Sequence, residues 1–112
     1  MMLNYKIEIE GKANPVPVVV FADKKYELAA TFLVGEARNF GAEIIAALDE
    51  VVSGKKKTGA FAGNVFSLEI APGKTTICDD ISGQECEIGT QDLRKLAEEY
   101  AAAYEKLLQK KK

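Results

Sequence analysis

The chain has 112 residues, with 15 basic and 17 acidic side chains and no histidine. This length suits one domain, and 47% apolar residues are typical of a folded chain rather than a disordered one. The missing histidine excludes Ser-His-Asp and Cys-His nucleophilic sites and imidazole metal ligands. A net charge of -2 argues against direct nucleic-acid binding, which needs a basic face.

Two strands are expected in the N-terminal part of the chain. Residues 3–10 (LNYKIEIE) alternate between apolar and polar side chains, which indicates a half-buried strand. After a turn, residues 16–22 (VPVVVFA) form a second strand, in which Pro17 favours an edge or a strand start. Residues 23–35 are compatible with a third strand or with a first helical segment, which Asp23 could cap.

From Leu33 the pattern becomes helical. Apolar side chains recur at intervals of three and four residues as far as Gly54, which is placed to end the helix. The apolar positions are Leu33, Ala37, Phe40, Ile44, Leu48 and Val51. Acidic residues, including Glu36, fall mostly on other faces of this helix, and Gly41 would allow close packing on a sheet.

The second half of the chain contains a predicted hairpin. Residues 59–63 (GAFAG) are typical of a flexible lead into a strand at 64–71. The Pro72-Gly73 turn joins that strand to a second arm at 75–78, and residues 85–88 could form a further edge strand.

The last helix has the clearest pattern. Thr90 is a suitable N-cap, and apolar side chains follow at helical spacing to about Gln109, so one face should pack on the sheet. The prediction is a single α+β domain spanning 1–112, in which an antiparallel sheet packs against two main helices. Residues 110–112 are expected to form a frayed lysine tail.

No apolar stretch resembles a secretory signal or is long enough to cross a membrane, so a cytoplasmic protein is expected. In that compartment Cys78 and Cys86 should be reduced thiols, small buried side chains on strands, with a redox or disulfide role as the alternative. Two thiols without histidine do not complete a zinc site. We therefore expect no metal and no cofactor.

Acidic residues are concentrated in the last third of the chain. Between Asp79 and Glu99 there are seven acidic and only two basic side chains. The residues that crowd one loop and a short strand, with one more behind them, are Asp79, Asp80, Glu85 and Glu87, followed by Asp92. Such a cluster is compatible with a solvated face, a partner-binding face, or a metal or catalytic carboxylate site. No calcium-loop spacing (D-x-D-x-D-G) is present.

Four strings, taken in order and spacing, resemble small bacterial immunity proteins of contact-dependent growth inhibition and related polymorphic toxin systems. They also resemble, more distantly, a small uncharacterised bacterial family. The strings are LDEVVSGK (48–55), AGNVFSLEI (62–70), TTICD (75–79) and CEIGTQDLRKL (86–96). The resemblance covers about residues 36–108 and does not extend to the first 35.

The resemblance implies a cytoplasmic, non-enzymatic protein that binds the C-terminal toxin domain of a large exported effector. Many such toxins are nucleases with basic active sites, and an acidic protein can occlude such a site and associate with it fast. We therefore expect the carboxylates of Asp79, Asp80, Glu85 and Glu87, with Asp92 behind them, to meet Lys or Arg in the toxin. Strand addition at residues 85–88 or at the strand bearing Pro17 is an alternative mode of contact.

Two other functions remain open at this point. One is a housekeeping small-molecule-binding or regulatory domain without a toxin partner. The other is an enzyme that uses carboxylates and a divalent metal. The immunity interpretation expects neither a small-molecule substrate nor a membrane or nucleic-acid partner.

Overall fold

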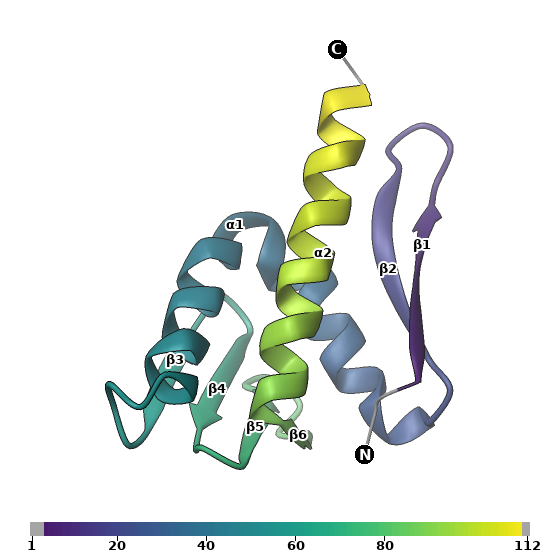
Figure 1. The fold of residues 1–112 in the computed structure, drawn as a ribbon. Helices are drawn as coiled ribbons and strands as arrows, with labels where there is room; N and C mark the ends of the chain where they lie inside the picture. The colour runs from purple at the N-terminus through teal and green to yellow at the C-terminus, as the bar shows by residue number, and fades with distance from the viewer. Residues whose placement is uncertain (1–3, 111–112) are drawn as a thin grey trace.

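A hairpin, a long helix, a four-stranded meander and a second long helix follow one another in the computed structural model, which describes residues 4–110 (Figure 1). The elements are β1 (Tyr5–Glu10), β2 (Val16–Phe21), the 3-10 turn η1 (Lys24–Tyr26), α1 (Glu27–Val52), β3 (Gly59–Ala62), β4 (Phe66–Ile70), β5 (Lys74–Asp79), β6 (Glu85–Gly89) and α2 (Thr90–Lys110). The α+β class is confirmed. The expected single sheet is instead two antiparallel sheets, β1–β2 and β3–β4–β5–β6.

The position of Pro17 follows from the register of the β1–β2 hairpin. Ile9 lies opposite Pro17, and the N–H of Ala22 donates to the carbonyl of Asn4 at 2.9 Å. Hydrogen-bonded and non-bonded pairs alternate along antiparallel strands, so the Ile9–Pro17 pair is a non-bonded one. The nitrogen of Pro17, which has no hydrogen to donate, therefore points away from β1.

Residues 24–35 are helical, as the 3-10 turn η1 followed by α1, which resolves the ambiguity in the sequence. Asp23 accepts a hydrogen bond from the N–H of Lys25 at 3.0 Å and caps η1, and α1 follows directly. Near the end of this helix Gly54 has φ +85°, the left-handed conformation expected of a terminating glycine. Helix α1 is kinked at Phe40, whose φ of -124° is not helical.

The expectation for Gly41 is wrong. A Cβ placed on Gly41 would have no neighbour within 4 Å, so this residue does not pack on the sheet. It follows the kink at Phe40 and lines an open hollow beside Tyr104 of α2 instead.

Residues 59–62, expected to be a flexible lead, form strand β3. Phe61 lies opposite Leu68 of β4, and its ring meets those of Phe32 and Phe40 from α1. The strand forms despite two alanines and a glycine because β4 supplies the hydrogen bonds and α1 covers Phe61.

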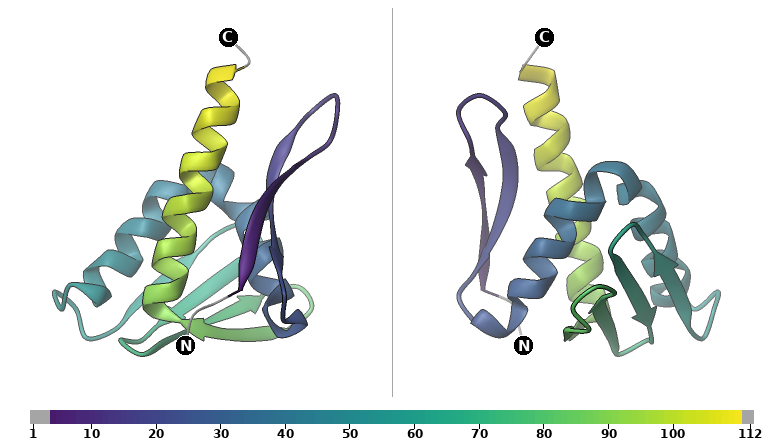
Figure 2. Two further views of the ribbon diagram at one scale, coloured as in Figure 1. Left: turned by 45° about the vertical axis from the view of Figure 1, so that its right-hand side comes forward. Right: turned by 180° about the vertical axis from the view of Figure 1, so that it is seen from behind.

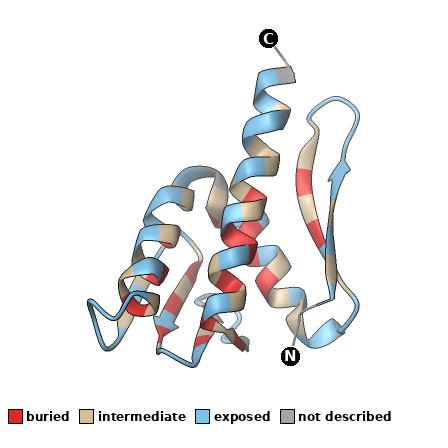
Figure 3. Cartoon of the chain, in the orientation of Figure 1, coloured by how far each residue is buried: buried red, intermediate tan, exposed pale blue. Residues whose placement is uncertain are grey.

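Buried side chains gather where α1, the first half of α2 and the meander meet (Figure 3). The largest fully buried apolar side chains are Tyr100, Phe32, Leu33, Ile44, Leu48, Leu68, Ile70, Ile77, Leu93 and Leu96. Thr90 begins α2, but its hydroxyl donates to the carbonyl of Ala71 and bonds the hydroxyl of Thr75. This side chain therefore ties the helix to the β4–β5 hairpin, where capping had been expected. Helix α2 includes Lys110, and residues 111 and 112 of the expected tail lie outside the described residues.

The position of Glu36 in α1 also differs from the expectation that acidic residues lie on other faces than the buried one. It is 1% exposed, not on a solvent face, and its Oε2 accepts the N–H of Asn64 at 2.8 Å. The carboxylate thus holds the turn between β3 and β4. A Cβ on Gly63 would collide with Oε2 of Glu36, so the carboxylate keeps this position because residue 63 is glycine.

Two tyrosine hydroxyls fasten the hairpin to α2. Tyr5 donates to Glu99 at 2.7 Å, and Tyr100 donates to the carbonyl of Pro17 at 2.7 Å. Burial, followed by the hydrogen bond to Glu99 and the charges of Glu99 and Asp92, raises the pKa of Tyr5 to about 12. Burial, with a smaller contribution from Tyr104, raises the pKa of Tyr100 to about 12.

We expect these two groups to make the fold sensitive to alkali. A phenol whose pKa is raised in the folded state is stabilising below the unfolded value of 10, and this contribution is lost as the pH rises through about 12. Urea unfolding between about pH 10 and pH 12 should show a free energy of unfolding that falls as the pH rises. The fall should be shallower in Tyr5→Phe, which lacks one of the two hydroxyls. An unchanged slope in Tyr5→Phe would show that the hydroxyl of Tyr5 does not resist ionisation.

Candidate functional site

The meander has one covered and one open face. Helices α1 and α2 both lie on the same side of it (Figure 2). On that side the β4 and β5 side chains Phe66, Leu68 and Ile77 are buried. Alternate residues such as Glu69 and Thr76 point to the other side, which no element of residues 4–110 covers.

Strand register arranges the open side into two rows across the sheet. One row runs Ala60, Glu69, Thr76, Glu87, and the next runs Ala62, Ser67, Cys78, Glu85. Asp80 joins the second row, since its Oδ1 accepts the hydroxyl of Ser67 at 2.9 Å. We call the surface formed by Glu69, Asp80, Glu85 and Glu87 around Thr76 and Cys78 the acidic face.

Three of the five residues predicted for partner binding lie on the acidic face. Asp80, Glu85 and Glu87 are all exposed there. Glu87 forms an ion pair with Lys74 at 2.8 Å, but both side chains are more than half exposed, so the pair contributes little to stability. These carboxylates are therefore available to an incoming partner.

Asp79 has a structural role in the β5–β6 turn. Its Oδ1 accepts the N–H groups of Ile81 at 2.9 Å and Ser82 at 3.1 Å. These backbone donors, Ser82 first, lower the pKa of Asp79, because they favour the charged carboxylate. The turn thereby sets the position of Asp80, which lies within it, and of Glu85, which begins β6.

Asp92 lies apart from the other four. It is half-buried in the first turn of α2, and its Oδ2 would be 2.7 Å from a Cβ placed on Gly89. Its charge also helps to raise the pKa of Tyr5. The structure therefore does not join Asp92 to the acidic face.

Glu69 is the member of the acidic face that sequence reasoning missed. It lies on β4, ten residues before the acidic cluster begins, and reaches the face only through strand pairing. The Pro72-Gly73 turn is the sequence signal that could have found it. A tight turn there pairs Ile70 with Thr75, and this register sets Glu69 opposite Thr76.

Cys78 lies in the middle of the acidic face. Desolvation, then the charges of Asp80, Glu85, Asp79 and Glu69, raise the pKa of its thiol. Cys86 is buried on the opposite side of the sheet, and both thiols are free. Of the predicted pair of buried cysteines, Cys86 is buried and Cys78 is partly exposed.

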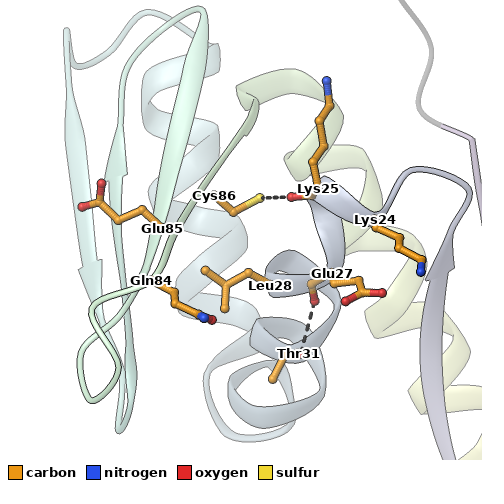
Figure 4. A pocket seen from close by; sticks show the side chains of 8 residues that line it. All are labelled: Lys24, Lys25, Glu27, Leu28, Thr31, Gln84, Glu85 and Cys86. Atoms are coloured by element: carbon orange, nitrogen blue, oxygen red, sulfur yellow. Dashed lines mark hydrogen bonds between the residues drawn. The ribbon is translucent and has the colours of Figure 1, made fainter.

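A groove of about 470 Å³ runs along β6, beside the acidic face (Figure 4). Its lining residues are Lys24, Lys25, Glu27, Leu28, Thr31, Gln84, Glu85 and Cys86. The thiol of Cys86 donates to the carbonyl of Lys25 at 3.2 Å, which joins β6 to η1 across the groove floor. Glu85 is the one residue shared by the groove lining and the acidic face, and its side chain points away from Lys24 and Lys25 (Figure 4).

The carboxylates of the acidic face are spread out and do not gather around one point. Within residues 4–110, no group of three or more Cys, Asp or Glu side chains is placed to hold a metal ion. In the same part of the chain, no helix has the length and apolar character needed to cross a membrane. These exposed carboxylates lie on neighbouring strands and on the β5–β6 turn.

Comparison with known proteins gives one relative. The chain is 32% identical over 80 residues to a protein of Bacillus cereus named "Immunity protein", an alignment that covers 68% of each chain. No protein-family model matches the sequence, and no solved structure matches it. An identity of this level over two thirds of both chains indicates common descent, and the protein belongs to the family of that immunity protein.

Proposed function

We propose that the protein is an immunity protein that binds and neutralises a cognate toxin domain of a contact-dependent growth inhibition or related polymorphic toxin system. The observation that carries the proposal is the kinship with the Bacillus cereus immunity protein. The acidic face supplies a surface for the task, because it is uncovered and carries four exposed carboxylates.

The charge of the surface favours a basic partner. Glu69, Asp80, Glu85 and Glu87 stand on three adjacent strands or the turn between them, against one lysine, Lys74. Nuclease clefts are basic because they bind phosphates. A toxin that cleaves nucleic acid would be drawn to the acidic face, which would then cover its substrate cleft.

The edge of β6 offers an additional mode of contact. The N–H of Asp79 donates to the carbonyl of Gln84 at 2.9 Å, so by alternation the backbone groups of Glu85 and Glu87 point away from β5. An extended toxin segment could pair there while its side chains enter the groove along β6. Both modes use Glu85. We expect the acidic face to contribute most of the binding energy.

Neutralisation by covering a cleft requires no catalysis by this chain, and it requires that the protein meet its toxin in the compartment where the toxin acts. For a nuclease that compartment is the cytoplasm.

Co-purification with the product of the adjacent upstream gene tests the proposed function. An immunity gene should follow its toxin gene directly, and a catalytically inactive form of that toxin should co-purify with this protein at equal stoichiometry. If the neighbouring gene encodes no toxin domain, or if the two products do not associate, the housekeeping interpretation takes its place.

A further inference from the structure

We propose that the free edge of β1 pairs with the same edge of a second copy of this chain, so that two hairpins form one four-stranded antiparallel sheet. The hairpin and the meander lie on opposite sides of α2 (Figure 1). The surface is therefore separate from the acidic face, and the inference does not depend on the proposed function.

The backbone of β1 has three residues with unpaired groups on its outer edge. The hydrogen-bonded pairing of Asn4 with Ala22 means that Tyr5, Ile7 and Ile9 are in non-bonded pairs with β2. Their N–H and C=O groups point away from β2, and no strand of residues 4–110 pairs with them. Unpaired edges of this kind are templates for strand addition.

The other edge of the hairpin is not equivalent. On β2 the residue opposite Ile9 is Pro17, which has no N–H, and its carbonyl already accepts the hydroxyl of Tyr100. The bond from Tyr100 of α2 therefore uses a backbone acceptor on the outer edge of β2. The outer edge of β1 is the one at which another strand could pair with the hairpin.

Charge complementarity selects a second copy as the occupant. A two-fold axis at Ile7 sets Tyr5 of one copy opposite Ile9 of the other, and all three residues with free groups then lie in hydrogen-bonded pairs. In this register Lys6 of each copy lies opposite Glu8 of the other. Within one chain the two side chains form an exposed ion pair at 3.6 Å. In the dimer each would also face the opposite charge of the other copy, and opposite charges directly across strands are stabilising.

Each neighbouring symmetric register contains a like-charge pair. Moving the axis by one residue toward the N-terminus sets Lys6 opposite Lys6. Moving it by one toward the C-terminus sets Lys6 opposite Glu10 but also Glu8 opposite Glu8. Like charges in these positions are destabilising. The chosen register also covers Ile9, which is 51% exposed in the single chain, by placing it beside Tyr5 of the other copy.

A charge-exchange experiment in the full chain, without toxin, tests the pairing. The variants are Lys6→Glu, Glu8→Lys and the double exchange Lys6→Glu/Glu8→Lys, and sedimentation velocity over a concentration series gives the dimer dissociation constant. Each single variant places two like-charged pairs across the interface. We expect its dissociation constant to rise about tenfold. The double exchange should restore the wild-type value.

An equal mixture of the two single variants gives the sharpest result. The Lys6→Glu chain carries two glutamates and the Glu8→Lys chain two lysines, so they should form a mixed dimer more readily than either forms its own. A monomeric wild-type chain at the highest concentration would overturn the inference. Equal dissociation constants for all variants would also overturn it. So would amide exchange of β1 that slows only when toxin is added, because the toxin and not a second copy would then cover this edge. Circular dichroism of each variant confirms that the exposed substitutions leave the fold unchanged.

Discussion

Reversing the four carboxylates of the acidic face should weaken toxin binding by about ten-thousandfold, because charge pairs that become desolvated at an interface each contribute on the order of a tenfold change. The variant replaces Glu69, Asp80, Glu85 and Glu87 by lysine. Asp79 is left intact because its carboxylate holds the β5–β6 turn. Calorimetric titration against an inactive toxin gives the affinity.

A control with the same change in net charge separates a local effect from a general one. The control replaces four other exposed acids by lysine, namely Glu10, Glu43, Glu98 and Glu105. The control should bind with affinity within a few-fold of the wild type. Equal losses in the two variants would mean that net charge alone drives association and that the acidic face has no special part in it.

The thiol of Cys78 gives a second readout at the same place. Because it lies among Asp80, Glu85 and Glu69, a bound toxin on the acidic face should protect it from a neutral alkylating reagent. Unchanged alkylation in the presence of saturating toxin would place the interface elsewhere on the molecule.

Replacing Glu36 by alanine should lower the free energy of unfolding by about 3 kcal/mol. The change removes a hydrogen bond from the N–H of Asn64 to a charged acceptor and leaves a cavity among α1, Phe61 and the β3–β4 turn. Glu36→Gln keeps an acceptor oxygen of the same reach and should lose only about 1 kcal/mol. Urea denaturation measures both.

Gly63 provides the matching half of a double-mutant cycle. Gly63→Ala should cost about 2 kcal/mol with Glu36 present, since the added Cβ would force a buried carboxylate to move. In a Glu36→Ala background the same change should cost clearly less, because the colliding group is gone. Equal costs in both backgrounds would contradict a direct Glu36–Gly63 contact.

The sequence predicts the elements that have a strong period and misses those that depend on tertiary contacts. The alternation at residues 5–10 and the apolar face of α2 correspond to β1 and to the buried side chains Leu93 and Leu96. Strand β3 has only four residues, two of them alanine, and exists because β4 pairs with it. Glu36 resembles a solvent-facing helical residue until the Asn64 turn is known to lie against it.

Part of the candidate surface follows from the same reasoning. Asp80, Glu85 and Glu87 are close in sequence, and a hairpin brings them onto one face without help from the rest of the fold. Glu69 requires the register of β4, and the separation of Asp92 requires the direction in which α2 leaves β6. Local proximity in the sequence therefore identifies the centre of the acidic face but not its boundary.

Inhibition of the toxin in solution tests most directly whether this chain neutralises a toxin by covering its cleft. The purified toxin domain encoded by the adjacent upstream gene would be titrated with this protein while cleavage of its nucleic-acid substrate is followed. We predict a stoichiometric loss of activity for the wild type and retained activity with the lysine variant of the acidic face. Full toxin activity in the presence of excess wild-type protein would contradict the account.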